Sequence, residues 1–133
     1  MPRILCFLTA LCLCITSSVC AAEIFRGVGE YYAEPTETVQ AANDMALKEA
    51  MRRVSEQAAV ALRSKSVAID SELTNDEVVM ATVSVLRILD RKFTIDTTPE
   101  GGIKSTATIT AEVDMEKAEE MAKKLLDEKT NKK

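Results

Sequence analysis

The chain has 133 residues, with 17 Lys and Arg against 21 Asp and Glu, which gives a formal net charge of −4. It contains no histidine and no tryptophan, and its four cysteines all lie within residues 1–20. The length suits one domain rather than two. An acidic chain with few aromatic residues is also a poor partner for nucleic acid, so we expect no nucleic-acid binding.

Residues 1–21 are predicted to be a signal peptide. A basic start with Arg3 precedes an apolar run over residues 4–15, and small residues end at Val19-Cys20-Ala21, which indicates cleavage near Ala21. The run is too short and too polar for a membrane span. Lipid attachment would use Cys20, but Ser17 and Val19 fit a lipidation site poorly, so ordinary cleavage is favoured. We therefore expect an exported, soluble protein in the periplasm or outside the cell.

Removal of residues 1–21 would take away every cysteine. Because the remaining chain also has no histidine, it could form no disulfide, no Cys-based or His-based catalytic site and no zinc site of the usual kind. No arrangement of Ser, Lys or carboxylates indicates another catalytic site. The chain is thus predicted not to be an enzyme and to need no cofactor and no metal.

Residues 24–33 alternate as a β-strand does. One predicted face carries Phe25, Gly27, Gly29 and Tyr31, and the other carries Ile24, Arg26, Val28, Glu30 and Tyr32. Pro35 should end the strand, and Thr36 is expected to cap the following helix.

A long amphipathic helix is predicted from about Glu37 to Arg63. Charged residues occupy one side, where Arg52 and Glu56 can pair. Because Gly27 and Gly29 share a strand face without side chains, we expect the alanine-rich side of the helix, at Ala50 and Val54, to cross the strand there. The predicted apolar stripe consists of Leu47, Ala50, Met51, Val54, Ala58, Ala61 and Leu62.

The segment from Ser64 to Leu73 reads as irregular, with a possible short strand at Val67 and Ile69. Thr74 and Glu77 have the spacing of a capping box, which predicts a short helix from Asn75 to about Thr82. A β-rich stretch over residues 83–97 changes its facing near Ile88, which indicates a bulge.

Residues 98–102 form a predicted turn, and residues 103–113 show the clearest alternation in the chain. Asp114 can cap a last helix from Met115 to about Asp127, with Glu119–Lys123 and Glu120–Lys124 at favourable spacing. This helix should pack either on the open face of its own sheet or against a partner. Its predicted partner-facing stripe is Met115, Ala118, Met121, Ala122 and Leu125.

The predicted fold class is α+β: a small antiparallel sheet of about three strands with the long helix packed on one face. The expected order is strand, long helix, short helix, strand, strand, helix. Residues 22–114 form the strand-helix-strand-strand module, and residues 115–133 form the C-terminal helix and a basic tail.

Three features of the sequence are candidate binding sites. Arg26-Gly27-Val28-Gly29 lacks the third glycine of a dinucleotide loop, so close helix packing explains it better. The acidic stretch over residues 70–77 could offer oxygens to calcium, but its spacing fits no known loop. Tyr31 and Tyr32 could frame a ligand pocket, although adjacent tyrosines on a strand usually point to opposite sides.

The pattern Gly27-x-Gly29, then Ala41-Ala42-x-x-Met45-Ala46-Leu47-x-x-Ala50-x-x-x-Val54, then a capped helix and a hairpin closing on Ala111-Glu112-Val113, resembles a known envelope module. It is similar to the N-terminal domain of the flagellar assembly protein T family and to the twenty-kilodalton outer-membrane lipoprotein family. The resemblance covers roughly residues 24–114. It implies a non-enzymatic binding or structural domain in the envelope of diderm bacteria.

The functional expectation is therefore an exported, non-enzymatic protein-interaction or structural module of the bacterial cell envelope, with a protein partner or self-association. The alternative is a periplasmic domain that binds a small molecule or glycan in a cleft between helix and sheet.

Overall fold

The computed structural model describes residues 22–132, so the predicted signal peptide and Cys20 lie outside the described residues. The fold is α+β, as predicted, and its three strands form one antiparallel sheet in the order β1-β3-β2. The elements are β1 (Ala22–Ala33), α1 (Val39–Lys65), α2 (Val67–Glu72), α3 (Asn75–Val83), β2 (Leu86–Thr97), β3 (Ile103–Asp114) and α4 (Met115–Asn131).

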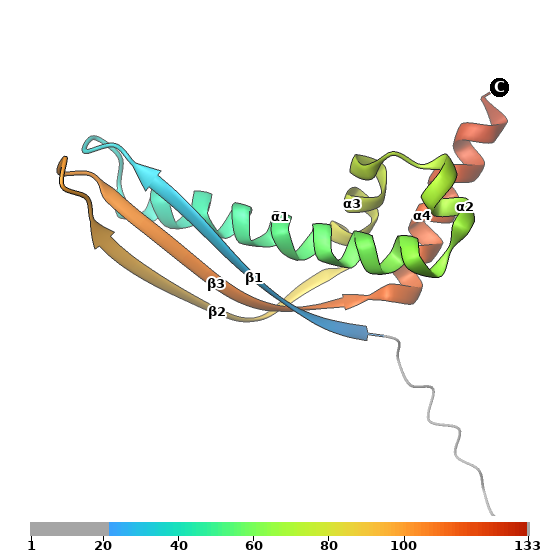
Figure 1. Ribbon diagram of the computed structural model, residues 1–133, viewed down its shortest axis with the longest axis horizontal. Helices are drawn as coiled ribbons and strands as arrows, with labels where there is room; N and C mark the ends of the chain where they lie inside the picture. The colour runs from blue at the N-terminus through green and yellow to red at the C-terminus, as the bar shows by residue number, and fades with distance from the viewer. Residues whose placement is uncertain (1–21, 133) are drawn as a thin grey trace, which may run out of the picture.

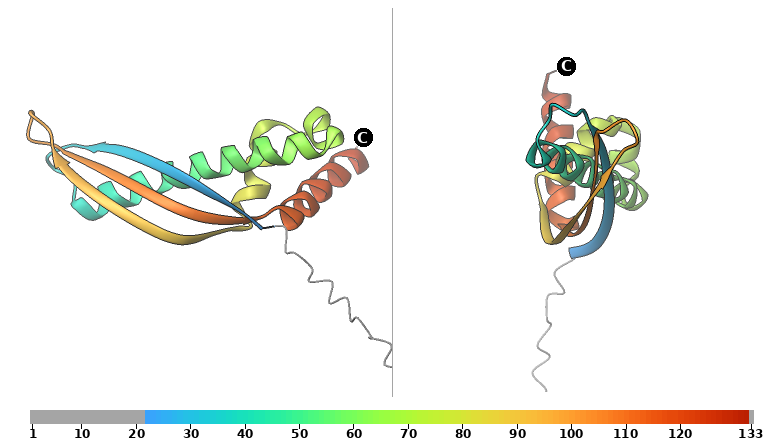
Figure 2. Two further views of the ribbon diagram at one scale, coloured as in Figure 1. Left: turned by 60° about the horizontal axis from the view of Figure 1, so that its bottom comes forward. Right: turned by 90° about the vertical axis from the view of Figure 1, so that its left-hand side faces the viewer.

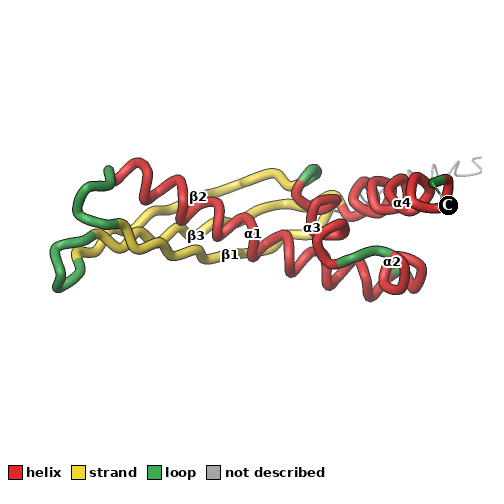
Figure 3. Tube along the Cα trace, turned by 90° about the horizontal axis from the view of Figure 1, so that it is seen from above, coloured by secondary structure: helices red, strands yellow, loops and turns green. Residues whose placement is uncertain are grey.

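The molecule is elongated, with α1 lying lengthwise on one face of the sheet (Figure 1). The three shorter helices gather at one end, beside the last turns of α1, while both chain reversals near residues 34–38 and 98–102 lie at the other end (Figures 1 and 2). Seen from above, α1 runs over the sheet toward the group formed by α2, α3 and α4 (Figure 3).

The start of α1 differs from the prediction. Thr38, not Thr36, caps the helix, and its hydroxyl accepts the N–H of Ala41 at 3.1 Å. Glu37 stays outside the helix because its carboxylate accepts the N–H of Glu34 at 2.9 Å, while its own N–H donates to the Glu34 carbonyl at 3.0 Å. Residues 34–37 therefore form a turn, and the N-cap lies at Thr38, two residues after the predicted position.

The predicted short strand at Val67 and Ile69 is wrong, because these residues belong to helix α2. Ser66 caps α2 by accepting the N–H of Ile69. Ile69 is fully buried, whereas Val67 is 84% exposed. The predicted capping box of α3 is confirmed, since Thr74 accepts the Glu77 N–H and the Glu77 carboxylate accepts the Thr74 N–H at 2.7 Å.

The sheet also follows the predicted pattern. The register of β2 against β3 shifts between Ile88 and Asp90, which places the bulge at Leu89. On β3, alternate residues from Ser105 to Val113 are buried beneath the helices. Asp114 caps α4 by accepting the Lys117 N–H at 3.1 Å. The Arg52–Glu56 and Glu119–Lys123 ion pairs are both present.

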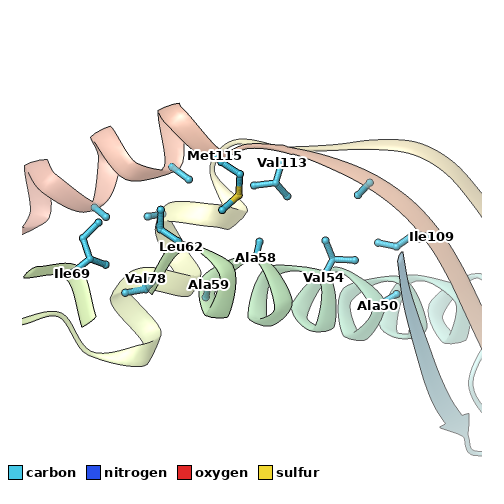
Figure 4. Close-up of a cluster of buried hydrophobic side chains, with 14 of the residues drawn as sticks. Ala50, Val54, Ala58, Ala59, Leu62, Ile69, Val78, Ile109, Val113 and Met115 are labelled. Carbon is cyan, nitrogen blue, oxygen red and sulfur yellow. The ribbon is translucent and has the colours of Figure 1, made fainter. Parts of the chain in front are cut away.

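The core has two connected parts (Figure 4). Along the sheet, Ala50, Val54 and Ala58 of α1 pack against Ile109 and the neighbouring residues of β3. At the helical end, larger side chains close the space between α1 and the shorter helices; these are Leu62, Ile69, Val78 and Met115. Among residues 22–132, no helix combines the length and apolar character that crossing a bilayer requires.

Candidate interaction surface

The two glycines of β1 lie directly under α1. A Cβ atom on Gly27 would stand 2.5 Å from the carbonyl oxygen of Ala50 and 2.7 Å from a methyl of Val54. A Cβ on Gly29 would stand 2.1 Å from the carbonyl oxygen of Ala46. The predicted helix–strand contact is therefore present, and it leaves no space between α1 and β1 for a phosphate or another ligand.

Tyr31 and Tyr32 point to opposite faces of β1. Tyr31 lies on the helix side, where its hydroxyl donates to Oε1 of Glu37 at 3.1 Å. That hydrogen bond to a carboxylate raises the pKa of Tyr31 above its ordinary value. Tyr32 is 62% exposed on the outer face, with the Nζ of Lys104 at 5.5 Å from its ring centroid. The two rings thus share no pocket, and a ligand-binding role for either one stays a prediction.

The acidic stretch of residues 70–77 is used for structure. Asp70 lies in α2, and Glu77 closes the α3 capping box while also accepting from the Lys129 ammonium at 3.2 Å. Hydrogen bonds from the Thr74 backbone and hydroxyl, then from Lys129, hold the pKa of Glu77 below its usual range. Within residues 22–132 no three acidic side chains converge as a metal site would require.

The predicted partner-facing stripe of α4 is mostly internal, which corrects that prediction. Met115, Ala118 and Ala122 are buried against α3 and the end of α1, and Leu125 is half-buried. Helix α4 packs on the other helices rather than across the open face of the sheet. Only Met121 remains at the surface, where it lines a shallow apolar hollow with Met80 between α3 and α4.

Strand β2 is the least covered of the three strands in the described chain, since it has no buried residue. Helix α1 packs across β1 and β3 but barely approaches β2. Both β1 and β2 are edge strands, because β3 lies between them. The edge of β1 is partly satisfied by α1, since the Gln57 side-chain amide donates to the carbonyl of Arg26 at 3.1 Å. The outer edge of β2, in contrast, borders no other strand in residues 22–132 and presents backbone N–H and C=O groups.

An apolar strip follows the helix-facing side of β2. Phe93 is half-buried and Ile95 is 40% exposed, although both point to the face that α1 covers elsewhere in the sheet. Asn43 of α1 accepts a hydrogen bond from Ser105 of β3 at 2.7 Å, which fixes the flank of the helix that faces the middle strand. Leu47 and Met51 follow Asn43 by one and two turns, and they extend this half-buried strip from the helix side.

The opposite face of β2 is charged. Near its start, Arg87 forms an ion pair across the sheet with Glu112. Farther along, Lys92 and Asp96 are exposed, and neither takes part in an ion pair within residues 22–132. Asp96 stands opposite Lys104 in the sheet, but the Lys104 ammonium contacts Glu30 at 3.0 Å instead. The pKa of Lys104 is raised by this Glu30 contact.

We call this surface the β2 flank. It consists of the open edge of residues 90–97, with its apolar strip and the two charges, together with Leu47 and Met51 of α1. Sequence reasoning missed it. The available signal was the density of charged residues over Asp90, Arg91 and Lys92, which is typical of an edge strand rather than a central one.

No protein-family model matches the chain, and a search of curated proteins finds no match either. The resemblance to the flagellar assembly and outer-membrane lipoprotein families stays a prediction.

Proposed function

We propose that the chain is an exported, non-enzymatic protein-interaction module of the bacterial cell envelope, and that it binds its partner through the β2 flank. The observation that carries this proposal is the contrast between the two edges of one sheet. The β1 edge lies under α1 and receives a side-chain hydrogen bond, whereas β2 presents an open backbone edge beside exposed Ile95. An added strand would satisfy that edge, and its side chains on the helix-facing side would pack beside the apolar strip.

The use of polar side chains in the described residues also supports a structural role. The buried hydroxyls serve packing: Ser55 donates to the Met51 carbonyl at 2.9 Å, and Thr82 donates to the carbonyls of Ser55 and Val79. The acidic groups whose pKa is lowered, such as Asp114 and Glu77, are held by helix-cap backbone N–H groups rather than grouped in a cleft.

The ligand-binding alternative receives less support. A cleft framed by Tyr31 or Tyr32 would need space between α1 and β1, but the backbone of α1 fills that space at Gly27 and Gly29. Ligand recognition by Tyr32 and Lys104 would then take place on the flat outer face of the sheet, where a small molecule would bury little of its surface.

Site-specific photo-crosslinking in a diderm bacterium tests the proposal. A photoreactive phenylalanine analogue at Thr94, on the open edge, should capture a protein in the cell envelope. The matched control places the same analogue at Thr106, which pairs directly with Thr94 but lies on the central strand. Adducts at Thr94 and few at Thr106 support the proposal. No adduct at Thr94, or equal capture at both positions, would overturn it.

A further inference from the structure

The geometry points to a definite occupant of the β2 flank. We propose that β2 pairs antiparallel with β2 of a second copy of this chain, about a two-fold axis through Thr94, to form a continuous six-stranded sheet. This inference rests on the proposed function, because it names the partner of the same strand edge. Two identical strands can pair antiparallel in only some registers.

Residues directly opposite each other in an antiparallel sheet point to the same face. Beyond the bulge at Leu89, the odd-numbered residues of β2 face the helix side and the even-numbered ones face outward, as their pairing with β3 requires. Two copies related by a two-fold axis must therefore pair odd with odd and even with even. The axis then has to pass between the two copies of one residue, so that this residue faces itself, and not between two successive residues of the strand.

Charge excludes most of these positions. An axis through Arg91, Lys92 or Asp96 places that charge opposite its own copy. An axis through Phe93 places Asp90 opposite Asp96, which is again a like-charge pair. An axis through Ile95 brings no opposite charges together, since Asp96 then meets Thr94.

An axis through Thr94 gives a consistent arrangement. It sets Lys92 of each copy opposite Asp96 of the other, and Phe93 of each copy opposite Ile95 of the other. The symmetry makes every such pair occur twice. Lys92 and Asp96, which take part in no ion pair within residues 22–132, would thereby gain partners of opposite sign.

The helix side fits the same arrangement. Because α1 packs against β1 and β3 rather than against β2, two copies joined at β2 would keep their long helices apart. The floor between the helices would be formed by Phe93 and Ile95 of both copies, and its walls by Leu47 and Met51 of both helices. Cross-strand packing of Phe93 against Ile95, which occurs twice, supplies affinity, while the two Lys92–Asp96 pairs select the register.

Disulfide trapping tests the register. The four native cysteines are replaced by alanine in the full chain, so that an introduced cysteine is unique. Thr94→Cys should give a covalent dimer on mild oxidation, because residues facing each other across an antiparallel pair have Cα atoms about 5 Å apart. Thr106→Cys is the matched control. Its two copies would lie three strand spacings apart, roughly 14 Å, and should stay unlinked.

Charge reversal tests the pairing. In light scattering over a range of concentrations, the wild-type chain should be a dimer. Lys92→Glu alone should weaken dimerisation about tenfold or more, and so should Asp96→Lys alone, because each creates two like-charge pairs. The double variant K92E/D96K should restore the dimer. Lys48→Glu makes the same charge change as K92E on an exposed turn of α1 and should have no effect.

The outcomes separate this inference from the proposed function. A monomer at all concentrations, a Thr94→Cys variant that does not link, or a double variant that fails to recover would each overturn pairing with a second copy. If Thr94 nevertheless captures a different protein in the cell, the β2 flank remains an interaction surface. If photo-crosslinking at Thr94 also fails, the proposed function fails with it.

Discussion

Gly29 and Ala46 approach each other more closely than any residue with a side chain would allow. A Cβ on Gly29 would lie 2.1 Å from the Ala46 carbonyl oxygen and 2.3 Å from the Ala50 nitrogen, both backbone atoms that no rotamer change can move. Strand and helix therefore touch backbone to backbone along this part of the interface. The alanines at positions 42, 46 and 50 of α1, all fully buried, complete the contact from the helix side.

Gly29→Ala should destabilise the fold by about 3 kcal/mol, because the added methyl must push α1 away from β1. Val28→Ala is the control, since Val28 lies between the two glycines but points to the outer face, and it should cost less than about 1 kcal/mol. Denaturant unfolding of both variants measures the difference. Equal stability of Gly29→Ala and the wild type would contradict the backbone contact.

Variants in α4 can test whether its apolar side packs inside the chain or against another protein. Ala122 is fully buried, so Ala122→Leu should overpack the helical end and lower stability by about 1–3 kcal/mol. Met121→Leu, one residue away at the surface, should change stability by less than about 0.5 kcal/mol. Thermal unfolding separates these outcomes. Were Ala122 part of an interface with another protein, Ala122→Leu would leave the stability of the isolated chain unchanged.

The hydrogen bond between Tyr31 and Glu37 should be visible in a titration. In a Tyr32→Phe variant, Tyr31 is the remaining one of the two tyrosines. Its phenolate should form with a pKa above the ordinary value of 10.0, because ionisation breaks the hydrogen bond and places a second negative charge beside Glu37. Ultraviolet absorbance follows the phenolate, and circular dichroism checks that the fold persists.

Adding Glu37→Gln to this variant should lower the pKa of Tyr31 back toward 10.0, since the neighbouring charge is gone. Because the folded-state pKa is raised, the interaction stabilises the fold below pH 10 and is lost as the pH rises through the Tyr31 pKa. If Glu37→Gln left the titration midpoint of Tyr31 unchanged, the hydrogen bond between Tyr31 and Glu37 would be ruled out.

Glu49 should make the free energy of unfolding depend on pH in the acid range. Arg52 donates to both of its carboxylate oxygens, at 2.6 and 3.0 Å, and Arg53 donates at 3.1 Å. These bonds, that of Arg52 first, lower the pKa of Glu49 from 4.5 to about 2. The carboxyl in the unfolded chain titrates near 4.5, so the contribution is complete above that pH and is lost as the pH falls from 4.5 toward 2.

Glu49→Gln removes this dependence. The variant should be less stable than the wild type at neutral pH, and the gap should close as the pH falls to about 2. Glu100→Gln, in the exposed turn before β3, is the control and should leave the shape of the curve unchanged. Urea unfolding measured at several pH values provides the comparison. A constant gap between Glu49→Gln and wild type across this range would contradict the assigned pKa.

Local signals in the sequence predicted much of the fold. The alternation over residues 103–113, the Thr74–Glu77 capping box and the Asp114 cap each depend on a few neighbouring residues, and each is confirmed. The contact at Gly27 and Gly29 was also accessible, because two bare positions on one strand face need a close neighbour.

The errors arose where two local patterns compete. Thr36 and Thr38 are both suitable caps, and the choice was decided by the Glu37 carboxylate, which closes a turn back onto Glu34. Val67 and Ile69 share a parity, yet two residues cannot distinguish a strand from a short helix. Ser66 decides the matter by capping α2.

The candidate surface was harder to predict because it depends on which strand lies in the middle. The sequence of residues 86–97 does not indicate that β3 pairs with β1 on its other side. It also does not indicate that α1 packs on β1 and β3 instead of β2. The buried stripe of α4 was misassigned for a similar reason, since its cover comes from α3 and α1.

The strand order has a consequence for how the chain assembles. Ala22, at the start of β1, pairs with Asp114, and β1 has no other strand beside it within the described chain. In a chain that is synthesised from its N-terminal end, β1 and α1 therefore precede β3, the last strand, which lies between the two edge strands. The sheet can therefore form only after nearly all of residues 22–114 are available, so its folding depends on contacts between residues that lie far apart in the sequence.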